Sequence, residues 1–384
     1  MSAIVYQKKV DGPATHAIVI GVGHYPHLPG GGKKKFANSE GMGQLKSPPQ
    51  SARAIGRWLI ESYNHPDKPL ASLSLLLSDS KDSKFKYESK GKEKTVQVSG
   101  ASMADVKPAI IEWRELGHKD PNHLLLFFFC GHGIALGPEL SLLLSDFGAN
   151  DVAPLDGAID FRRFRQGMDE CAAREQCYFV DACRVGSELL IKNSGFAGQP
   201  IIQSAGTVNT TGRFRQAPVF YSTLSGAQAY AKTGEPSVYT KALLEAFAGA
   251  GAGDEDGDWR VRTNLLHDAL GFLVIDASEI LKVPQMQIAP SDDLSSINLN
   301  VIDKPEVPVI VSCKPKEANR DATLTCESAA IKMKRKPGED AWRLRLPVDT
   351  YDFTAKIKTK DFTKPKFAVR PTFRRVNLDI KVNE

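Results

Sequence analysis

The stretch Leu124-Leu-Leu-Phe-Phe-Phe-Cys-Gly-His-Gly133 decides the fold of this 384-residue chain. Its first six residues are large and apolar with no polar alternation, which is typical of a β-strand buried on both faces. Strands of this kind occur in parallel sheets that helices cover on both sides. The Gly-His-Gly that follows marks the point where the chain leaves the sheet.

The segments on either side of this strand repeat its character. The sequence predicts strands at residues 17–22, 73–77, 177–180 and 219–224, and helices at residues 51–63, 102–116, 161–171, 237–248 and 265–281. Alternation of strand and helix favours an α/β fold with a mainly parallel central sheet. Sheets of this kind bind ligands at the carboxyl ends of their strands.

The last 80 residues have a different pattern. Residues 305–384 consist of short segments with period-two alternation, separated by Pro, Gly, Asp or Asn, which predicts a small all-β, sandwich-like domain. Residues 1–300 then form the first domain. Within it, the charged stretch 80–98 is expected to be an exposed insertion or a mobile loop, and residues 192–217 a long loop.

Composition narrows the class of protein. Residues 305–384 carry 18 Lys and Arg against 11 Asp and Glu, but these charges are scattered, so we expect a solvated surface and no nucleic-acid partner. The N-terminus has no signal-peptide pattern and no apolar run approaches the roughly 20 residues that span a bilayer, so we expect a cytoplasmic protein with no membrane contact. Six scattered cysteines without metal-ligand spacing indicate free thiols and no metal or other cofactor.

Two polar tips lie just past the carboxyl ends of predicted strands. His132 follows the Phe-rich strand, and Cys183 follows Cys177-Tyr-Phe-Val180. A thiol becomes a strong nucleophile as thiolate, for which it needs an imidazole within reach. The pair therefore predicts a cysteine nucleophile with a histidine acid–base. The backbone amides of Gly133 and Cys183 are candidates for an oxyanion hole.

Five segments together resemble a known family. They are HAIVIGVGHY (16–25), LLLFFFCGHG (124–133), CYFVDACRVGS (177–187), VFYSTLSGAQAY (219–230) and SVYTKALLEAFAG (237–249). The chain from about residue 15 to residue 300 resembles the caspase and metacaspase cysteine peptidases of clan CD, peptidase C14 type, most closely the prokaryotic members. The resemblance implies a caspase-like fold, Cys183 as nucleophile, His132 as the catalytic histidine and Gly133 as an oxyanion donor, with protein or peptide substrates.

Asp181 departs from the caspases that cut after aspartate. Those enzymes have Gln-Ala-Cys, whereas this chain has Asp181-Ala-Cys183, as metacaspases and paracaspases do. A carboxylate in the first specificity (S1) pocket would pair with a basic side chain, and Arg can bind it through two hydrogen bonds. We therefore expect cleavage after Arg in preference to Lys. The alternative is that Asp181 only caps the turn that follows the strand.

Several further alternatives stay open. Cys130 is a rival nucleophile, although a side chain one step before Gly131 is expected to face the core. Loop 192–217 lies where caspases carry their processed linker, so Arg213 and Arg215 are candidate processing sites of a zymogen. That zymogen would be activated by a protease or a regulatory protein in a prokaryotic defence or cell-death pathway. Residues 254–258 lack the Glu of an EF-hand, so calcium dependence is only an option. A catalytically silent interaction module is the alternative to an enzyme.

Overall fold

We describe a computed structural model of the chain. It describes residues 2–79, 83–193, 196–203, 215–224, 229–255, 257–283, 288 and 295–380. Arg213 lies outside the described residues, as does half of the predicted loop 192–217.

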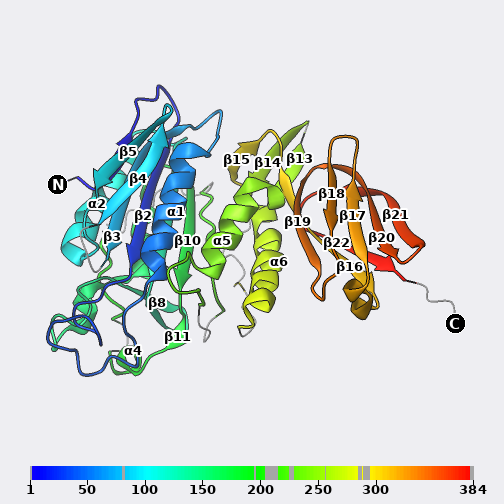
Figure 1. Cartoon of the computed structure of the whole chain (residues 1–384). Helices are drawn as coiled ribbons and strands as arrows, with labels where there is room; N and C mark the ends of the chain where they lie inside the picture. The colour runs from blue at the N-terminus through cyan, green and yellow to red at the C-terminus, as the bar shows by residue number, and fades with distance from the viewer. Residues whose placement is uncertain are drawn as a thin grey trace. The chain divides into compact units, whose positions relative to one another are not determined.

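The first compact unit is built on a six-stranded sheet with the order β1-β3-β2-β6-β10-β12 (Figure 1). The strands are β1 (Ile4–Gln7), β2 (Thr15–Val22), β3 (Leu70–Ser78), β6 (Leu124–Gly131), β10 (Glu175–Ala182) and β12 (Val219–Tyr221). All neighbours are parallel except β1 and β3. Every residue of β2, β3 and β6 is buried, because helices shield both faces of the sheet. The predicted α/β architecture is confirmed.

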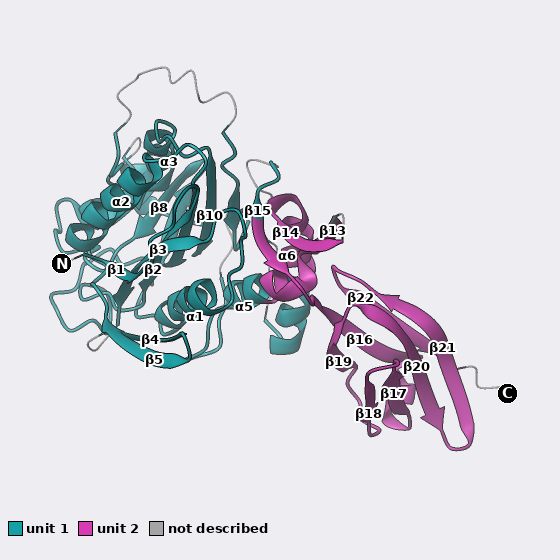
Figure 2. Cartoon of the chain, turned by 90° about the horizontal axis from the view of Figure 1, so that it is seen from above, with its two compact units in different colours: residues 1–244, 273–298 teal, residues 245–272, 299–384 magenta. Residues whose placement is uncertain are grey.

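Helices lie on both faces of this sheet. The described α-helices of the chain are α1 (Ser47–Glu61), α2 (Met103–Gly117), α3 (Phe161–Met168), α4 (Glu188–Lys192), α5 (Val238–Glu245) and α6 (Thr263–Leu281). Figure 2 shows α1 and α5 on one face of the sheet and α2 and α3 on the other. Helix α1 begins with two prolines, which fit the first turn of a helix, and buries Ala52, Ile55 and Leu59 on one stripe.

A small second sheet joins the two loops that leave the ends of β6 and β10. It contains β7 (Gly133–Leu136), β8 (Glu139–Leu143), β9 (Ala158–Asp160) and β11 (Val185–Gly186), in the order β11-β7-β8-β9. Strand β11 pairs with β7 in parallel, with Val185 opposite Ile134. The chain is therefore tethered on both sides of His132 and of Cys183.

The charged stretch 80–98, expected to be an exposed insertion or a mobile loop, has regular secondary structure in its described part. From residue 84 to residue 97 it forms an antiparallel hairpin of β4 (Lys84–Ser89) and β5 (Lys92–Gln97). Phe85 and Tyr87 alternate with exposed lysine and glutamate, and both rings are buried and stacked on each other, with centroids 5.4 Å apart. The two aromatic residues form the packed face of the hairpin, and the many lysines in the sequence obscured this alternation.

The second compact unit comprises residues 245–272 and 299–384, and the first comprises residues 1–244 and 273–298. The C-terminal strands are β16 (Glu306–Lys314), β17 (Thr323–Glu327), β18 (Lys332–Arg335), β19 (Trp342–Pro347), β20 (Asp349–Ile357), β21 (Lys360–Val369) and β22 (Arg374–Asp379). They form two sheets, β19-β16-β22 and β18-β17-β20-β21, that share one apolar core. The predicted all-β region is confirmed. The domain boundary between residues 300 and 305 stays a prediction, since the second unit also takes in residues 245–272.

That additional segment carries β13 (Ala252–Glu255) and β14 (Asp258–Arg262), which form a three-stranded sheet with β15 (Asn298–Ile302). In the stretch 254–258, considered above for calcium, Asp254 and Glu255 belong to β13 and Asp258 begins β14, with Glu255 paired with Asp258.

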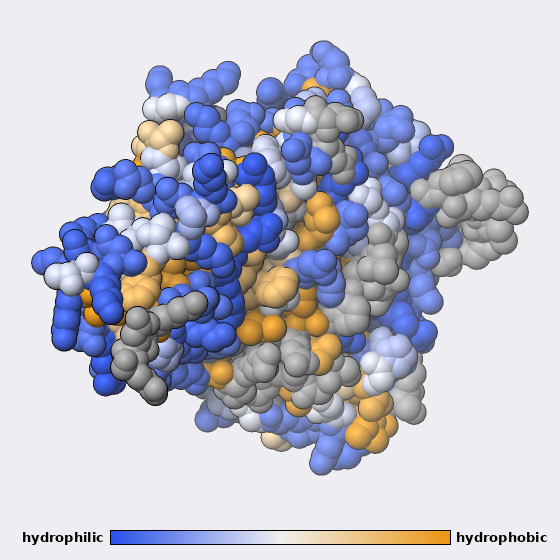
Figure 3. Space-filling model, turned by 90° about the vertical axis from the view of Figure 1, so that its right-hand side faces the viewer, coloured by the Kyte–Doolittle hydropathy of each residue, from blue (hydrophilic) through white to orange (hydrophobic). Residues whose placement is uncertain are grey.

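Charged side chains are dispersed over the surface. The face in Figure 3 is mostly hydrophilic, with apolar residues between the polar ones. Several basic residues of the second unit are paired with acids, including Lys332 with Glu327 (2.7 Å) and Arg345 with Glu245 (2.8 Å). Among the described residues, no helix has the length and hydropathy needed to cross a bilayer.

Candidate active site

The sheet register places His132 and Cys183 side by side. Strands β6 and β10 are parallel neighbours, and their last paired residues are Gly131 and Ala182. His132 directly follows β6, and Cys183 directly follows β10. Both residues therefore lie at the carboxyl edge of the sheet. This is the edge at which α/β proteins bind ligands.

A pocket of about 510 Å³ opens at this edge. His132, Cys183, Asp181 and Cys130 all line it, together with residues 44–48 and the segment that begins at Ala229. The structure therefore brings the predicted nucleophile, acid–base and specificity residue to one cavity. The rival thiol of Cys130 lies in the same cavity.

The imidazole of His132 is held in one orientation. Its Nε2 lies 2.8 Å from the carbonyl oxygen of Gly43. A carbonyl oxygen only accepts hydrogen bonds, so Nε2 carries the proton and Nδ1 has the free lone pair. Burial lowers the pKa of His132, which keeps the ring neutral and able to accept a proton.

Tyr25 and Gln44 brace the histidine, and sequence reasoning did not single them out. The His132 backbone N–H donates to the Tyr25 hydroxyl oxygen (2.8 Å), and the two rings lie 4.9 Å apart. The Gln44 side chain accepts from the Tyr25 N–H and donates to the Tyr25 carbonyl oxygen, each at 2.9 Å. Gln44 is adjacent to Gly43, so this clamp fixes the carbonyl that orients His132. Tyr25 lies in the quoted motif HAIVIGVGHY, but nothing local marks Gln44.

The Cys183 thiol is partly buried and has a backbone hydrogen-bond donor. Its Sγ accepts a hydrogen bond from the Ala229 N–H (3.3 Å). Burial, with a smaller contribution from the carboxylate of Asp181, raises the pKa of the thiol above its ordinary value. A raised pKa favours the neutral thiol over the thiolate.

The position of Gly133 requires glycine. A Cβ atom there would lie 2.5 Å from the carbonyl oxygen of Cys183. Gly133 faces Leu142 across the β7–β8 pair, and the Leu143 N–H donates to the His132 carbonyl oxygen (3.0 Å). Gly133 is thus a non-hydrogen-bonded position of that antiparallel ladder, which leaves its amide unused by β8. The oxyanion role of this amide stays a prediction.

The carboxylate of Asp181 is buried, with 2% of the residue exposed, and is bonded on one side only. Its Oδ2 accepts hydrogen bonds from Ser237 Oγ, from Thr240 Oγ1 (2.8 Å) and from the Cys130 thiol (3.4 Å). Among the described residues, its Oδ1 has no hydrogen-bond partner. Burial raises the pKa of Asp181, and the donors on Oδ2 offset part of that rise.

Two observations bear on the alternatives for Asp181 and Cys130. The carboxylate accepts hydrogen bonds from two α5-end side chains and a thiol, and no turn amide after β10 is among its described donors. The Cys130 thiol is buried and donates to Asp181, and burial raises its pKa well above the ordinary value. Cys130 is therefore held as a thiol.

Arg215 is anchored, and Arg213 lies outside the described residues. The Arg215 guanidinium donates to the carbonyl oxygens of Met168 and Cys171, the latter at 2.7 Å, at the C-terminal end of α3. Cleavage after Arg215 would have to release these contacts. Both processing sites stay predictions.

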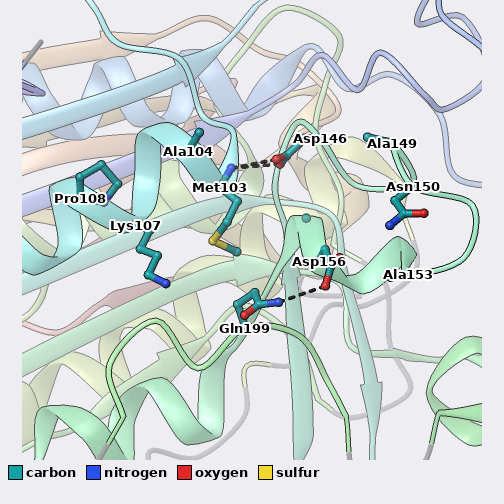
Figure 4. Close-up of a pocket in the computed structure, with 11 residues that line it drawn as sticks. Met103, Ala104, Lys107, Pro108, Asp146, Ala149, Asn150, Ala153, Asp156 and Gln199 are labelled. Carbon is teal, nitrogen blue, oxygen red and sulfur yellow. Dashed lines mark hydrogen bonds between the residues drawn. The ribbon is translucent and has the colours of Figure 1, made fainter.

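A further pocket of about 510 Å³ lies at the N-terminus of α2 (Figure 4). There both oxygens of the Asp146 carboxylate accept from the Met103 N–H, at 3.0 and 3.1 Å. Gln199 donates to Asp156 (3.0 Å). These contacts cap the helix and tie down a loop, and none of the lining residues is a cysteine or histidine. Elsewhere among the described residues, no three His, Cys, Asp or Glu side chains gather as a metal site would require.

The comparisons with known proteins identify the family of this chain. Residues 14–265 match the family model of the caspase domain of peptidase family C14, so the chain belongs to the caspase-domain cysteine peptidase family, whose substrates are proteins. The uncharacterized protein y4kE of Sinorhizobium fredii is 28% identical over 190 residues, 49% of this chain. The match spans about half, 52%, of that relative's length.

Two solved structures are similar in outline. A structural-genomics protein of Geobacter sulfurreducens has a TM-score of 0.40 at 12% identity, covering 76% of this chain and 95% of that one. Caspase-1 of Spodoptera frugiperda has a TM-score of 0.43 at 11% identity, covering 75% and 91%.

Proposed function

We propose that this chain is a cysteine endopeptidase that cleaves proteins after a basic residue, Arg in preference to Lys. The observation that carries the proposal is the half-satisfied carboxylate of Asp181, which lines the same pocket as Cys183 and His132. A buried, negatively charged oxygen without a partner is costly unless a ligand supplies the missing donors. A guanidinium supplies two N–H donors and a positive charge, so it fits this oxygen better than a lysine ammonium does.

The chemistry is acyl transfer in two steps. Nδ1 of His132 takes the thiol proton as Sγ of Cys183 attacks the carbonyl carbon of the substrate. The amides of Gly133 and Cys183 stabilise the oxyanion, at about 2.7–4 kcal/mol for each donor. His132 then protonates the leaving amine as the C–N bond breaks, which leaves a thioester on Cys183. Water, deprotonated by His132, attacks the thioester and regenerates the thiol.

The proposal extends to control of the enzyme. A zymogen cut in loop 192–217, after Arg213 or Arg215, would be processed by its own specificity or by an activating protease. The wider proposal is that the enzyme acts in the cytoplasm in a prokaryotic defence or cell-death pathway, with no cofactor. Intact-mass analysis of active protein tests the processing step: active full-length chain would show that no cut is required.

The test of the catalytic assignment compares three variants on an Arg-ending fluorogenic peptide. Cys183→Ala and His132→Ala should both lose hydrolysis by at least about 10³-fold. Cys130→Ser keeps a hydrogen-bond donor beside Asp181 and should retain activity within a few-fold. Loss in Cys130→Ser with retention in Cys183→Ala would reverse the assignment. Absence of turnover in the processed wild type would favour the silent interaction module.

A further inference from the structure

A separate pocket of about 380 Å³ lies at the amino edge of the central sheet. His16 and Ser72, near the starts of β2 and β3, line it, as does His123, which immediately precedes β6. The catalytic pair lies at the carboxyl edge of the same parallel strands. Eight-residue strands separate the two edges by roughly 25 Å. This pocket is therefore distinct from the candidate active site.

The rim of the pocket is basic. Lys8, Lys9 and Lys119 line it, against a single acidic residue, Asp120. The Asp120 carboxylate already accepts the Asn122 N–H (2.8 Å). Lys9 lies 3.8 Å from exposed Asp11, whereas Lys8 and Lys119 have no ion-pair partner among the side chains that the structure describes.

Two buried imidazoles form the inner wall. His16 is 6% exposed and His123 is 7% exposed, and their rings meet edge to face with centroids 4.8 Å apart. His123 Nδ1 accepts the Ala14 N–H (2.9 Å), so its Nε2 carries the proton and is a donor. His16 Nδ1 bonds to the Ser72 hydroxyl (2.8 Å). No described partner is bonded to the Nε2 atom of either ring.

Burial favours the neutral form of both rings. Burial, the neighbouring His123 and the Lys119 charge lower the pKa of His16 to about 4. Burial also lowers the pKa of His123, with Lys119 and Lys68 acting in the same direction and Asp120 opposing them. Lys68 itself is ion-paired with Glu175. A bound anion would raise the pKa of both rings, because it favours their protonated form.

We propose that this pocket binds a small tetrahedral oxyanion, a free phosphate or the phosphoryl group of a small phosphomonoester, held by Lys8 and Lys119, with protonation of His16 and His123 linked to binding. Proton uptake distinguishes such a site from a lysine-rich surface, which would bind anions without it. The inference is independent of peptidase activity.

Calorimetric titration of the full chain with sulfate tests the proposal, since sulfate remains a dianion between pH 5.5 and pH 8. At matched ionic strength we expect saturable binding, about fivefold or more tighter at pH 5.5, with net proton uptake measured in two buffers of different ionisation enthalpy. Parallel titrations with inorganic phosphate and phosphoserine separate the two sources of the ligand: tighter phosphoserine binding identifies a phosphomonoester, and the reverse a free phosphate.

Single-residue variants test whether the anion binds at this pocket. Lys119→Ala should weaken sulfate binding about fivefold or more, because it removes one of two unpaired charges. Lys107→Ala changes an exposed lysine of α2 that lies outside this pocket, and it should leave sulfate binding unchanged. His16→Gln and His123→Gln should abolish the proton uptake. Absence of saturable binding, equal weakening by the two lysine variants, or binding without proton uptake in the wild type would each overturn the proposal.

Discussion

Replacing Asp181 by Asn tests two effects of its buried charge separately: its effect on the stability of the fold and its effect on the turnover of Arg substrates. The change keeps the shape of the side chain and an oxygen for the Ser237, Thr240 and Cys130 donors, but it removes the charge. Because burial raises the pKa of Asp181 in the folded state, the carboxyl stabilises the fold most when protonated, and this contribution is lost as pH rises through the folded-state pKa. Above the folded-state pKa the buried charge of Asp181 is unfavourable for the native chain.

We expect Asp181→Asn to raise the free energy of unfolding at pH 8 by about 1 kcal/mol, given the usual 1–3 kcal/mol cost of an unsatisfied buried polar group. For a unit of this size that is a rise in Tm of about 2–4 °C. The gain should shrink as the pH falls, because the native carboxyl takes up its proton. The same variant should lose about 10²- to 10³-fold in kcat/KM for Arg peptides, because the substrate cation is left without its partner.

Thermal scans at pH 4 and pH 8, with peptide kinetics on the same samples, provide the assay. Ser237→Ala is the matched control: it removes a donor to the same carboxylate and should lower Tm at pH 8. A fall in Tm for Asp181→Asn at pH 8, or unchanged Arg turnover, would refute the reasoning.

Three further measurements test the rest of the site: one pH–rate profile and the kinetics of two variants. Because burial lowers the pKa of His132, the acidic limb of kcat/KM should lie below the ordinary histidine value of about 6.5. A limb at 7 or above would contradict the neutral imidazole. Gln44→Ala should lower kcat about 10- to 100-fold with little change in KM, and it should shift the acidic limb, since it frees the Gly43 carbonyl that orients the His132 ring. A purely structural role of Gln44 would lower Tm and leave the limb in place. Gly133→Ala should lower kcat by about 10²-fold or more, whereas Gly186→Ala, whose added Cβ meets open space, should not; equal rates for the two variants would exclude the predicted crowding at Cys183.

The sequence allowed prediction of the parts of the fold that depend on local pattern. Continuous apolar runs such as residues 124–129 predicted the parallel sheet, because strands buried on both faces cannot alternate. Strand-end position then predicted that His132 and Cys183 lie close together, and the register of β6 and β10 places them side by side. The sequence predicted an exposed insertion or a mobile loop at residues 80–98 but not the hairpin at residues 84–97, since two aromatic rings among many charges decide its packing.

Other features depend on contacts between distant segments and could not be read locally. The Gly43 carbonyl reaches His132 across 89 residues, and the clamp on Tyr25 spans 19. The one-sided bonding of Asp181 likewise depends on α5, more than 50 residues further along the chain. No periodicity in the sequence encodes such pairs.

The central claim is that Cys183 and His132 cleave substrates bound in a pocket that the Asp181 carboxylate lines. The most direct test is kcat/KM for three otherwise identical fluorogenic peptides that end in Arg, Lys or Asp, measured on the processed wild type with Cys183→Ala as the blank. We predict the order Arg, then Lys, with Asp at the level of the blank. Preferential cleavage after Asp would contradict the account.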